Sequence, residues 1–138
     1  PKVIQTKPFG FLVIFGNGSQ FYPWIHYGDF CKAISFVINH RMSGIINLTA
    51  PNPLSNRDFI SEINRQLNRK VFQFAIPAFI LKWLLGDLSQ PLLSSANVMP
   101  DTLIKDGFKF EFENLDKAII DLLNLNPTDL IMKDYYLP

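Results

Sequence analysis

The amino-acid sequence predicts an α/β fold, because segments with helical periodicity alternate with short apolar segments typical of strands. Apolar residues make up 48% of the 138 residues and charged residues 18%, a composition that favours a packed globular core and excludes intrinsic disorder. A third observation is the stretch at 45–50, which is almost continuously apolar and β-branched. Strands of this kind are usually covered on both faces, as in a parallel sheet.

The first predicted strand covers residues 9–15 and runs into the glycine-rich turn 16–18. Residues 22–25 are a candidate return arm, and Pro23 would place that arm at a sheet edge or a bulge. The turn lacks the spacing of a P-loop or a dinucleotide fingerprint. We therefore interpret it as a turn between strands rather than as a phosphate cradle.

The first predicted helix begins at Asp29, whose carboxylate can accept hydrogen bonds from the free amides of the first turn. His40 suits the negative end of the helix dipole, and Gly44 is expected to end the helix. Apolar side chains at helical spacing predict its buried face: Phe30, Ala33, Ile34, Val37 and Ile38.

The segment 45–50 is predicted to be a strand buried in a parallel sheet. Such a strand needs parallel neighbours, and the chain offers no obvious ones beside it. We therefore expect it to be the last strand of a sheet whose other strands lie outside this chain.

A second helix is predicted from Ser55 to about Asn68, because Ser55 and Asp58 form a capping-box-like start. Residues 71–76 alternate between apolar and other side chains and predict a strand. A third helix is expected to begin at Pro77.

The third helix is apolar almost all round over residues 79–85, and Pro91 is expected to end or kink it. A short helix is predicted at 100–105. Residues 108–112 alternate phenylalanine with charged side chains, which predicts a half-buried strand pairing with the strand at 71–76. Asn114 is expected to cap a last helix.

Charge and cysteine content exclude several classes of function. Thirteen Lys and Arg balance twelve Asp and Glu, and they are scattered, so a nucleic-acid partner is not expected. Cys31 is the single cysteine and suits a reducing, cytoplasmic setting. No stretch is long enough to span a bilayer, and the start at Pro1 shows no signal peptide. The absence of an initiator Met indicates a piece of a longer protein.

The candidate chemical groups are few. One Cys and two well-separated His do not match the usual metal-ligand spacings, and no serine or cysteine triad is indicated. His40 is interpreted as a surface residue. His26 has two open interpretations: a histidine bonded to backbone at a tight turn, or a pocket residue aimed at a ligand. No catalytic residue, cofactor ligand or metal ligand is predicted within this chain.

The ordered combination of motifs resembles the extended short-chain dehydrogenase/reductases, and within them the NAD(P)-dependent epimerase/dehydratase branch with a distinctive C-terminal domain. The motifs that carry the resemblance are Gly16-x-Gly18-x-Gln20, Trp24-Ile25-His26-x-x-Asp29, Asn47-Leu48-Thr49-Ala50-Pro51, residues 71–77, Leu84-Leu85-Gly86-Asp87, Val98-Met99-Pro100 and Gly107-Phe108-x-Phe110. The resemblance runs from about residue 9 to residue 123.

The resemblance implies a Rossmann-type fold of which this chain is the C-terminal part: a late sheet strand followed by a small α/β domain on the substrate side. The family holds NAD(P) on a glycine fingerprint and uses a Tyr-x-x-x-Lys pair, and this sequence has neither. The longer protein would then bind NAD(P), and this chain alone would bind no cofactor and catalyse nothing.

The resemblance also implies which residues line the substrate cleft, namely Gln20, Trp24 and His26. The family's usual substrates are nucleoside-diphosphate sugars. Its members tend to have an arginine shortly after the glutamine, where it contacts the diphosphate, whereas this chain has Tyr22. That departure puts a nucleotide-sugar substrate in doubt, and a small-molecule substrate is expected.

The predicted organisation has the end of a Rossmann-type domain and a cleft-lining segment at 1–54, a small α/β domain at 55–125, and a tail at 126–138. The main function predicted is that of a substrate-side part of an NAD(P)-dependent epimerase or oxidoreductase. The alternative is a non-catalytic binding or regulatory module, since some members of the branch are labelled as cell-division inhibitors. An uncovered strand would also favour self-association of the chain.

Overall fold

The computed structural model describes residues 10–67 and 71–124, and its fold is α/β, as the sequence predicts. In chain order the elements are β1 (Gly10–Phe15), β2 (Phe21–Tyr22), α1 (Tyr27–Asn39), β3 (Leu54–Ser55), α2 (Asn56–Gln66), β4 (Val71–Ile76), α3 (Ala78–Leu85), the 3₁₀ helix η1 (Gly86–Ser89), α4 (Gln90–Leu93), α5 (Asp101–Lys105) and α6 (Leu115–Asn124). The predicted tail at 126–138 lies outside the described residues.

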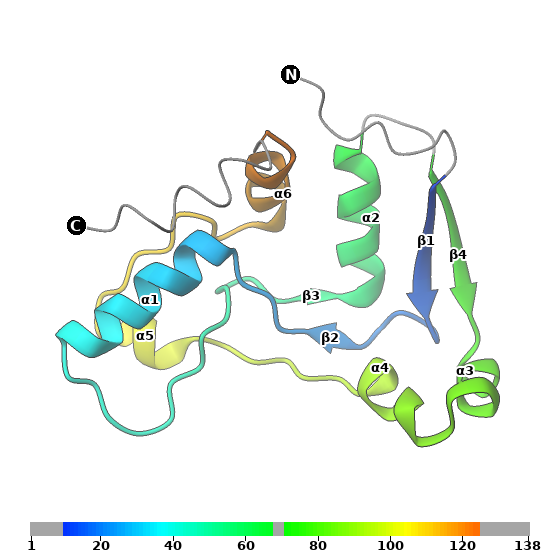
Figure 1. The fold of residues 1–138 in the computed structure, drawn as a ribbon, viewed down its shortest axis with the longest axis horizontal. Coiled ribbons are helices and arrows are strands. Elements are labelled where there is room, and N and C mark those ends of the chain that lie inside the picture. Colours follow the sequence, from blue (N-terminus) through cyan, green and yellow to red (C-terminus); the bar gives the residue numbers. More distant parts are fainter. Residues whose placement is uncertain (1–9, 68–70, 125–138) are drawn as a thin grey trace.

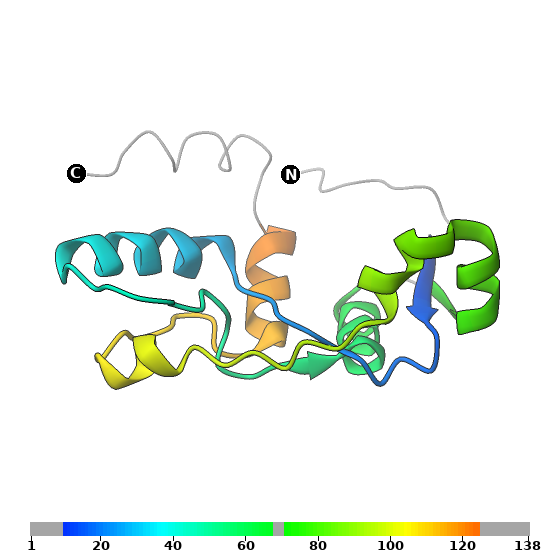
Figure 2. The same cartoon turned by 90° about the horizontal axis from the view of Figure 1, so that it is seen from below.

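The elements form two groups joined by extended segments (Figures 1 and 2). One group holds α1, α5 and α6, and the other holds β1, β4, α2, α3 and α4. Helices α2 and α6 contact each other where the groups meet. The predicted domain boundaries at residues 54 and 125 stay predictions.

Strands β1 and β4 pair in parallel, from Gly10 opposite Val71 to Phe15 opposite Ile76. The sequence correctly predicts both strands but not their partners. Residues 22–25 are not the return arm of β1, because β2 instead pairs antiparallel with β3, Phe21 opposite Ser55. The turn at 16–18 therefore leads the chain away from its own sheet, and the parallel partner arrives through α2.

One face of the β1–β4 sheet is covered and the other is open. Ile14 is buried, and β1 packs against α2. On the other face Phe11 lies near Phe72 and Phe74, with ring centroids 6.4 and 6.1 Å apart, and all three rings are exposed. Strand β4 was predicted to pair with the segment 108–112, and that prediction is wrong.

Helix α1 begins two residues before the predicted start. Its cap is His26, whose Nδ1 accepts a hydrogen bond from the Gly28 amide, 3.2 Å away. Asp29 is not the cap, because its carboxylate accepts from the amides of Glu111 and Phe112 at 2.9 and 2.8 Å. The Asp29 side chain is 0% exposed, so it joins α1 to a segment more than eighty residues later in the chain.

The buried face of α1 is only partly the predicted one. Ala33 is fully buried, and Phe36 and Val37 pack against the core beside it. Several of the predicted positions are exposed: Phe30, Ile34 and Ile38. The helix thus buries a narrower strip than its apolar pattern suggests.

The segment 45–50 pairs with no strand among the described residues. Ile45 is 91% exposed, whereas Ile46 and Leu48 pack against the core of Ala33, Leu103 and Phe108. Other groups hold this segment in place: the Ala50 amide donates to the Trp24 carbonyl, and the Asn47 and Thr49 side chains donate to the carbonyls of Met99 and Val98. Because its expected partner strands lie outside this chain, its place as the last strand of a sheet stays a prediction.

The segment 108–112 also forms no strand, although its phenylalanines alternate. Phe108 is buried in the core with Leu103, and its ring packs edge-on against Phe36 at 5.3 Å. Two amides that a sheet ladder would use, those of Glu111 and Phe112, donate to Asp29 instead. A buried carboxylate thus replaces a strand partner.

The start of α2 follows its local signal closely. Ser55 caps α2 by accepting from the Asp58 amide, and its hydroxyl donates to the Asp58 carboxylate at 2.6 Å. Pro77 is the cap that precedes α3, one residue before the predicted first position of the helix. Pro91 does not end that helix. It lies in the first turn of α4, where a missing amide costs nothing.

None of the described helices is long and apolar enough to cross a membrane.

Candidate functional site

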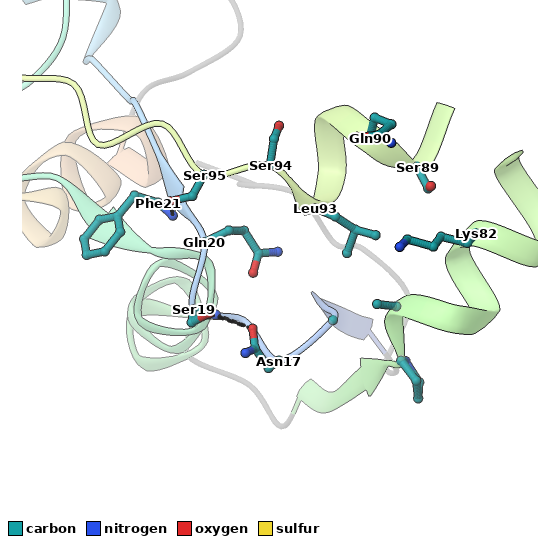
Figure 3. Close-up of a pocket in the computed structure, with 13 residues that line it drawn as sticks. Asn17, Ser19, Gln20, Phe21, Lys82, Ser89, Gln90, Leu93, Ser94 and Ser95 are labelled. Atoms are coloured by element: carbon teal, nitrogen blue, oxygen red, sulfur yellow. Dashed lines mark hydrogen bonds between the residues drawn. The ribbon is translucent and has the colours of Figure 1, made fainter. Parts of the chain in front are cut away.

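The larger pocket opens at the carboxyl ends of the two parallel strands, the edge at which α/β sheets most often bind ligands. Its volume is about 850 Å³. Three segments surround it: the turn after β1, the start of α3 directly after β4, and the stretch from η1 through α4 (Figure 3). The lining residues are Gly16, Asn17, Ser19, Gln20, Phe21, Pro77, Ala78, Lys82, Ser89, Gln90, Leu93, Ser94 and Ser95.

The turn that forms one wall requires glycine. Gly18 has φ +74°, and a Cβ there would lie 2.6 Å from a methyl carbon of Ile14, so no other residue fits without a shift. Arg57 fixes the turn from the first turn of α2: its amide donates to the Gly18 carbonyl and its guanidinium to the Asn17 carbonyl. The wall is therefore held in one conformation by a neighbouring helix.

The amides of this turn are already engaged. Gly16 donates to the Ile76 carbonyl, Gly18 to the Phe15 carbonyl, and Ser19 to the Asn17 side chain. A pyrophosphate cradle needs several amides aimed at the ligand. The residues of this turn therefore do not fit the pyrophosphate of a dinucleotide cofactor. This agrees with the interpretation of 16–18 as an ordinary turn.

Gln20 is the most buried polar side chain that lines the pocket from this turn, 5% exposed. Its Nε2 donates to the carbonyls of Phe15 at 2.9 Å and Leu92 at 3.1 Å. The Tyr22 hydroxyl donates to the same Leu92 carbonyl. Two side chains after β1 thus anchor α4, which lines the pocket.

A second pocket of about 580 Å³ lies along α1, between the segment 108–112 and α6. His26 and Asp121 are among its lining residues, and His26 Nε2 lies 3.3 Å from the Asp121 carboxylate. The ring of Phe112 lies 3.8 Å from that of His26, centroid to centroid. His26 is 3% exposed, so it is mainly an anchor between α1 and α6.

Lys32 and Glu111 form an exposed ion pair at the rim of this second pocket. The hydrogen bond from Lys32 to Glu111 raises the pKa of the Lys32 amine, partly offset by desolvation. Exposed pairs of this kind add little stability. The rim is therefore a surface feature rather than a reactive centre.

The three predicted substrate residues do not meet in one pocket. Gln20 lines the larger pocket and His26 the smaller one, while Trp24 lines neither and donates from its indole nitrogen to the Asn52 carbonyl at 3.0 Å. Each of the three has a clear structural partner. Their role as substrate ligands stays a prediction.

The sequence did not predict the part of the larger pocket that α3, η1 and the segment after α4 form. Its polar residues include Lys82, Ser89 and Ser95. The one available signal was Lys82, a single charge inside the apolar stretch 79–85. A single charged residue in an otherwise apolar helix indicates that its side chain faces a polar cavity.

Comparison with known sequences identifies relatives for most of the chain. Residues 76–122 match a domain of unknown function, DUF1731. An epimerase family protein of Staphylococcus aureus (strain MRSA252) is 36% identical over 110 residues, 79% of this chain and 36% of the relative. An epimerase family protein of Staphylococcus epidermidis is 38% identical over 109 residues, 78% of this chain and 36% of that relative.

A solved structure has the same fold. The human epimerase family protein SDR39U1 (isoform 2), crystallised with NADPH, superposes with a TM-score of 0.71 at 27% identity, over 80% of this chain and 38% of the human chain. This chain therefore spans little more than a third of the proteins it matches. The chain is similar to part of epimerase family proteins, and its fold matches part of the extended short-chain dehydrogenase/reductase fold.

Proposed function

We propose that this chain is the substrate-side part of an NAD(P)-dependent epimerase or oxidoreductase, and that the larger pocket receives part of the substrate. The observation that carries the proposal is the place of this pocket, at the carboxyl ends of parallel strands β1 and β4. A related protein solved with NADPH supports the cofactor class of the whole protein.

The division of labour follows from what the residues here offer. The sequence has no glycine fingerprint and no Tyr-x-x-x-Lys pair, and the amides of the turn after β1 are engaged. The cofactor and the proton-transferring residues would come from the remainder of the longer protein. This chain would hold and orient the substrate through side chains such as Gln20.

The proposal is tested by titrating NADPH and NADP⁺ into two proteins, the 138-residue chain and the product of the complete reading frame. NADPH fluorescence and calorimetry would report binding. We expect micromolar affinity for the complete protein and no measurable binding for the chain. Micromolar binding by the chain alone, or none by the complete protein, would contradict the proposal.

A second candidate is a non-catalytic binding or regulatory module. The observation in its favour is the outer surface of α3, where Phe79, Trp83 and Leu84 are exposed, Trp83 at 84%. Apolar patches of this kind often mark interaction sites. A partner recovered by the wild-type chain and lost by the double variant Trp83→Glu, Leu84→Lys would favour this candidate, provided that circular dichroism shows an intact fold.

A further inference from the structure

The lining of the larger pocket offers both acceptors and donors. The hydroxyls of Ser19, Ser89 and Ser94 donate to other protein groups, so their oxygens can accept from a ligand. Two donors also remain. The Ser95 hydroxyl accepts from the Phe21 amide at 2.9 Å, which leaves its own proton available. The Asn17 side-chain oxygen Oδ1 accepts from the amide and the hydroxyl of Ser19, so the side-chain Nδ2 is the group left for a ligand. A ligand that fits these donors must present acceptor oxygens.

Gln20 adds one acceptor at the base of the pocket. Its Nε2 donates to two backbone carbonyls, which can only accept, and this fixes the orientation of the amide. Its Oε1 is then the atom that the side chain, which extends into the pocket, presents to a ligand (Figure 3). An oxygen acceptor binds a hydroxyl and repels an anionic oxygen.

The charge of the residues that line the pocket restricts the class of ligand further. Within the part of the chain that the structure describes, Lys82 is the one charged residue that lines this pocket, and its amine extends into the pocket from the side opposite Gln20 (Figure 3). No arginine contributes to this lining. Diphosphates are usually held by several cationic or bidentate donors, whereas one lysine matches a single negative charge.

We propose that the larger pocket binds a small hydroxy-carboxylate, with Lys82 pairing with the carboxylate and the Gln20 Oε1 accepting from a hydroxyl. This inference rests on the proposed substrate-side function and adds the class of substrate to it. It also makes Lys82 a specificity-determining residue, which selects a monoanion over a neutral polyol.

The test uses three probes with the isotope-labelled 138-residue chain: D-gluconate, its neutral analogue sorbitol, and inorganic pyrophosphate. Amide chemical shifts at 16–21 and 89–95 would report binding. Gluconate is expected to bind with a Kd of about 1 mM, the range of a ligand of this size. Lys82→Gln should weaken gluconate about fivefold and leave sorbitol unchanged, since only an exposed charge pair is lost.

Lys117→Gln is the matched control, because Lys117 is exposed on α6 and lines neither pocket. It should leave the affinity for gluconate unchanged. Gluconate that binds no better than sorbitol, or equally well to the Lys82→Gln variant, would overturn the proposal. Pyrophosphate that binds at the same amides more tightly than gluconate would overturn it as well.

The outcome is separable from that of the proposed function. Loss of the gluconate preference with intact NADPH binding by the complete protein would reject the substrate class alone. A preserved gluconate preference without NADPH binding would reject the oxidoreductase assignment and leave a carboxylate-binding module.

Discussion

At the scale of single residues, the polar side chains at the start of α1 have structural tasks. His26 caps α1 through Nδ1, and Asp29 accepts two amides from a distant segment. Sequence alone predicts that polar residues gather before α1. It does not predict their partners, because the amides of Glu111 and Phe112 lie more than eighty residues away. Long-range hydrogen bonds leave no local pattern.

Replacing Asp29 with alanine should cost about 3 kcal/mol of unfolding free energy, because two amides would lose a buried charged acceptor. Asp29→Asn keeps one acceptor oxygen and should cost roughly half as much. Urea denaturation followed by circular dichroism measures both variants. A loss below about 0.5 kcal/mol for the alanine variant would contradict the role assigned to this carboxylate.

At the scale of elements, the start of α2 is predictable from the sequence and the partners of the strands are not. A capping residue such as Ser55 acts within its own turn, so the sequence contains the whole signal. A strand needs a partner from elsewhere, and the segment 108–112 shows how this misleads. It has strand-like composition, yet two of its amides donate to the Asp29 carboxylate instead of to a neighbouring strand.

Ser55→Ala should destabilise the chain by about 1 kcal/mol, through loss of the cap on the first turn of α2. Ser35→Ala is the control, since Ser35 is an exposed serine within α1 that donates only to the Cys31 carbonyl one turn earlier. Its effect should lie within about 0.5 kcal/mol. Equal losses in the two variants, measured by urea denaturation, would show that the cap contributes nothing specific.

At the scale of the whole molecule, the resemblance of the ordered motifs predicted the related proteins correctly. The apolar periodicity did not predict how the strands pair in the sheet. The reason is that the family motifs report turns and caps, such as the glycine turn at 16–18, whereas the sheet depends on pairing between β1 and β4. The uncovered apolar surface was expected around 45–50. In the structure much of it lies instead on the open face of this sheet and on α3.

We propose that copies of the chain associate through the open sheet face, where Phe11, Phe72 and Phe74 are exposed beside unpaired strand edges. Sedimentation velocity should show a dimer at micromolar concentration, and Phe72→Lys should shift it to monomer. Phe30→Lys is the control, because Phe30 is exposed on α1 in the other group of elements. A wild-type chain that stays monomeric at 100 μM would contradict the proposal.

The central claim, that this chain is the substrate-side part of a longer enzyme, is tested most directly by reading the coding sequence upstream of the Pro1 codon. We predict an in-frame segment of roughly 150 residues, about one domain, with a Gly-x-x-Gly-x-x-Gly turn and a Tyr-x-x-x-Lys pair. An in-frame stop codon, or an unrelated sequence, would contradict the claim and leave the binding module as the better account.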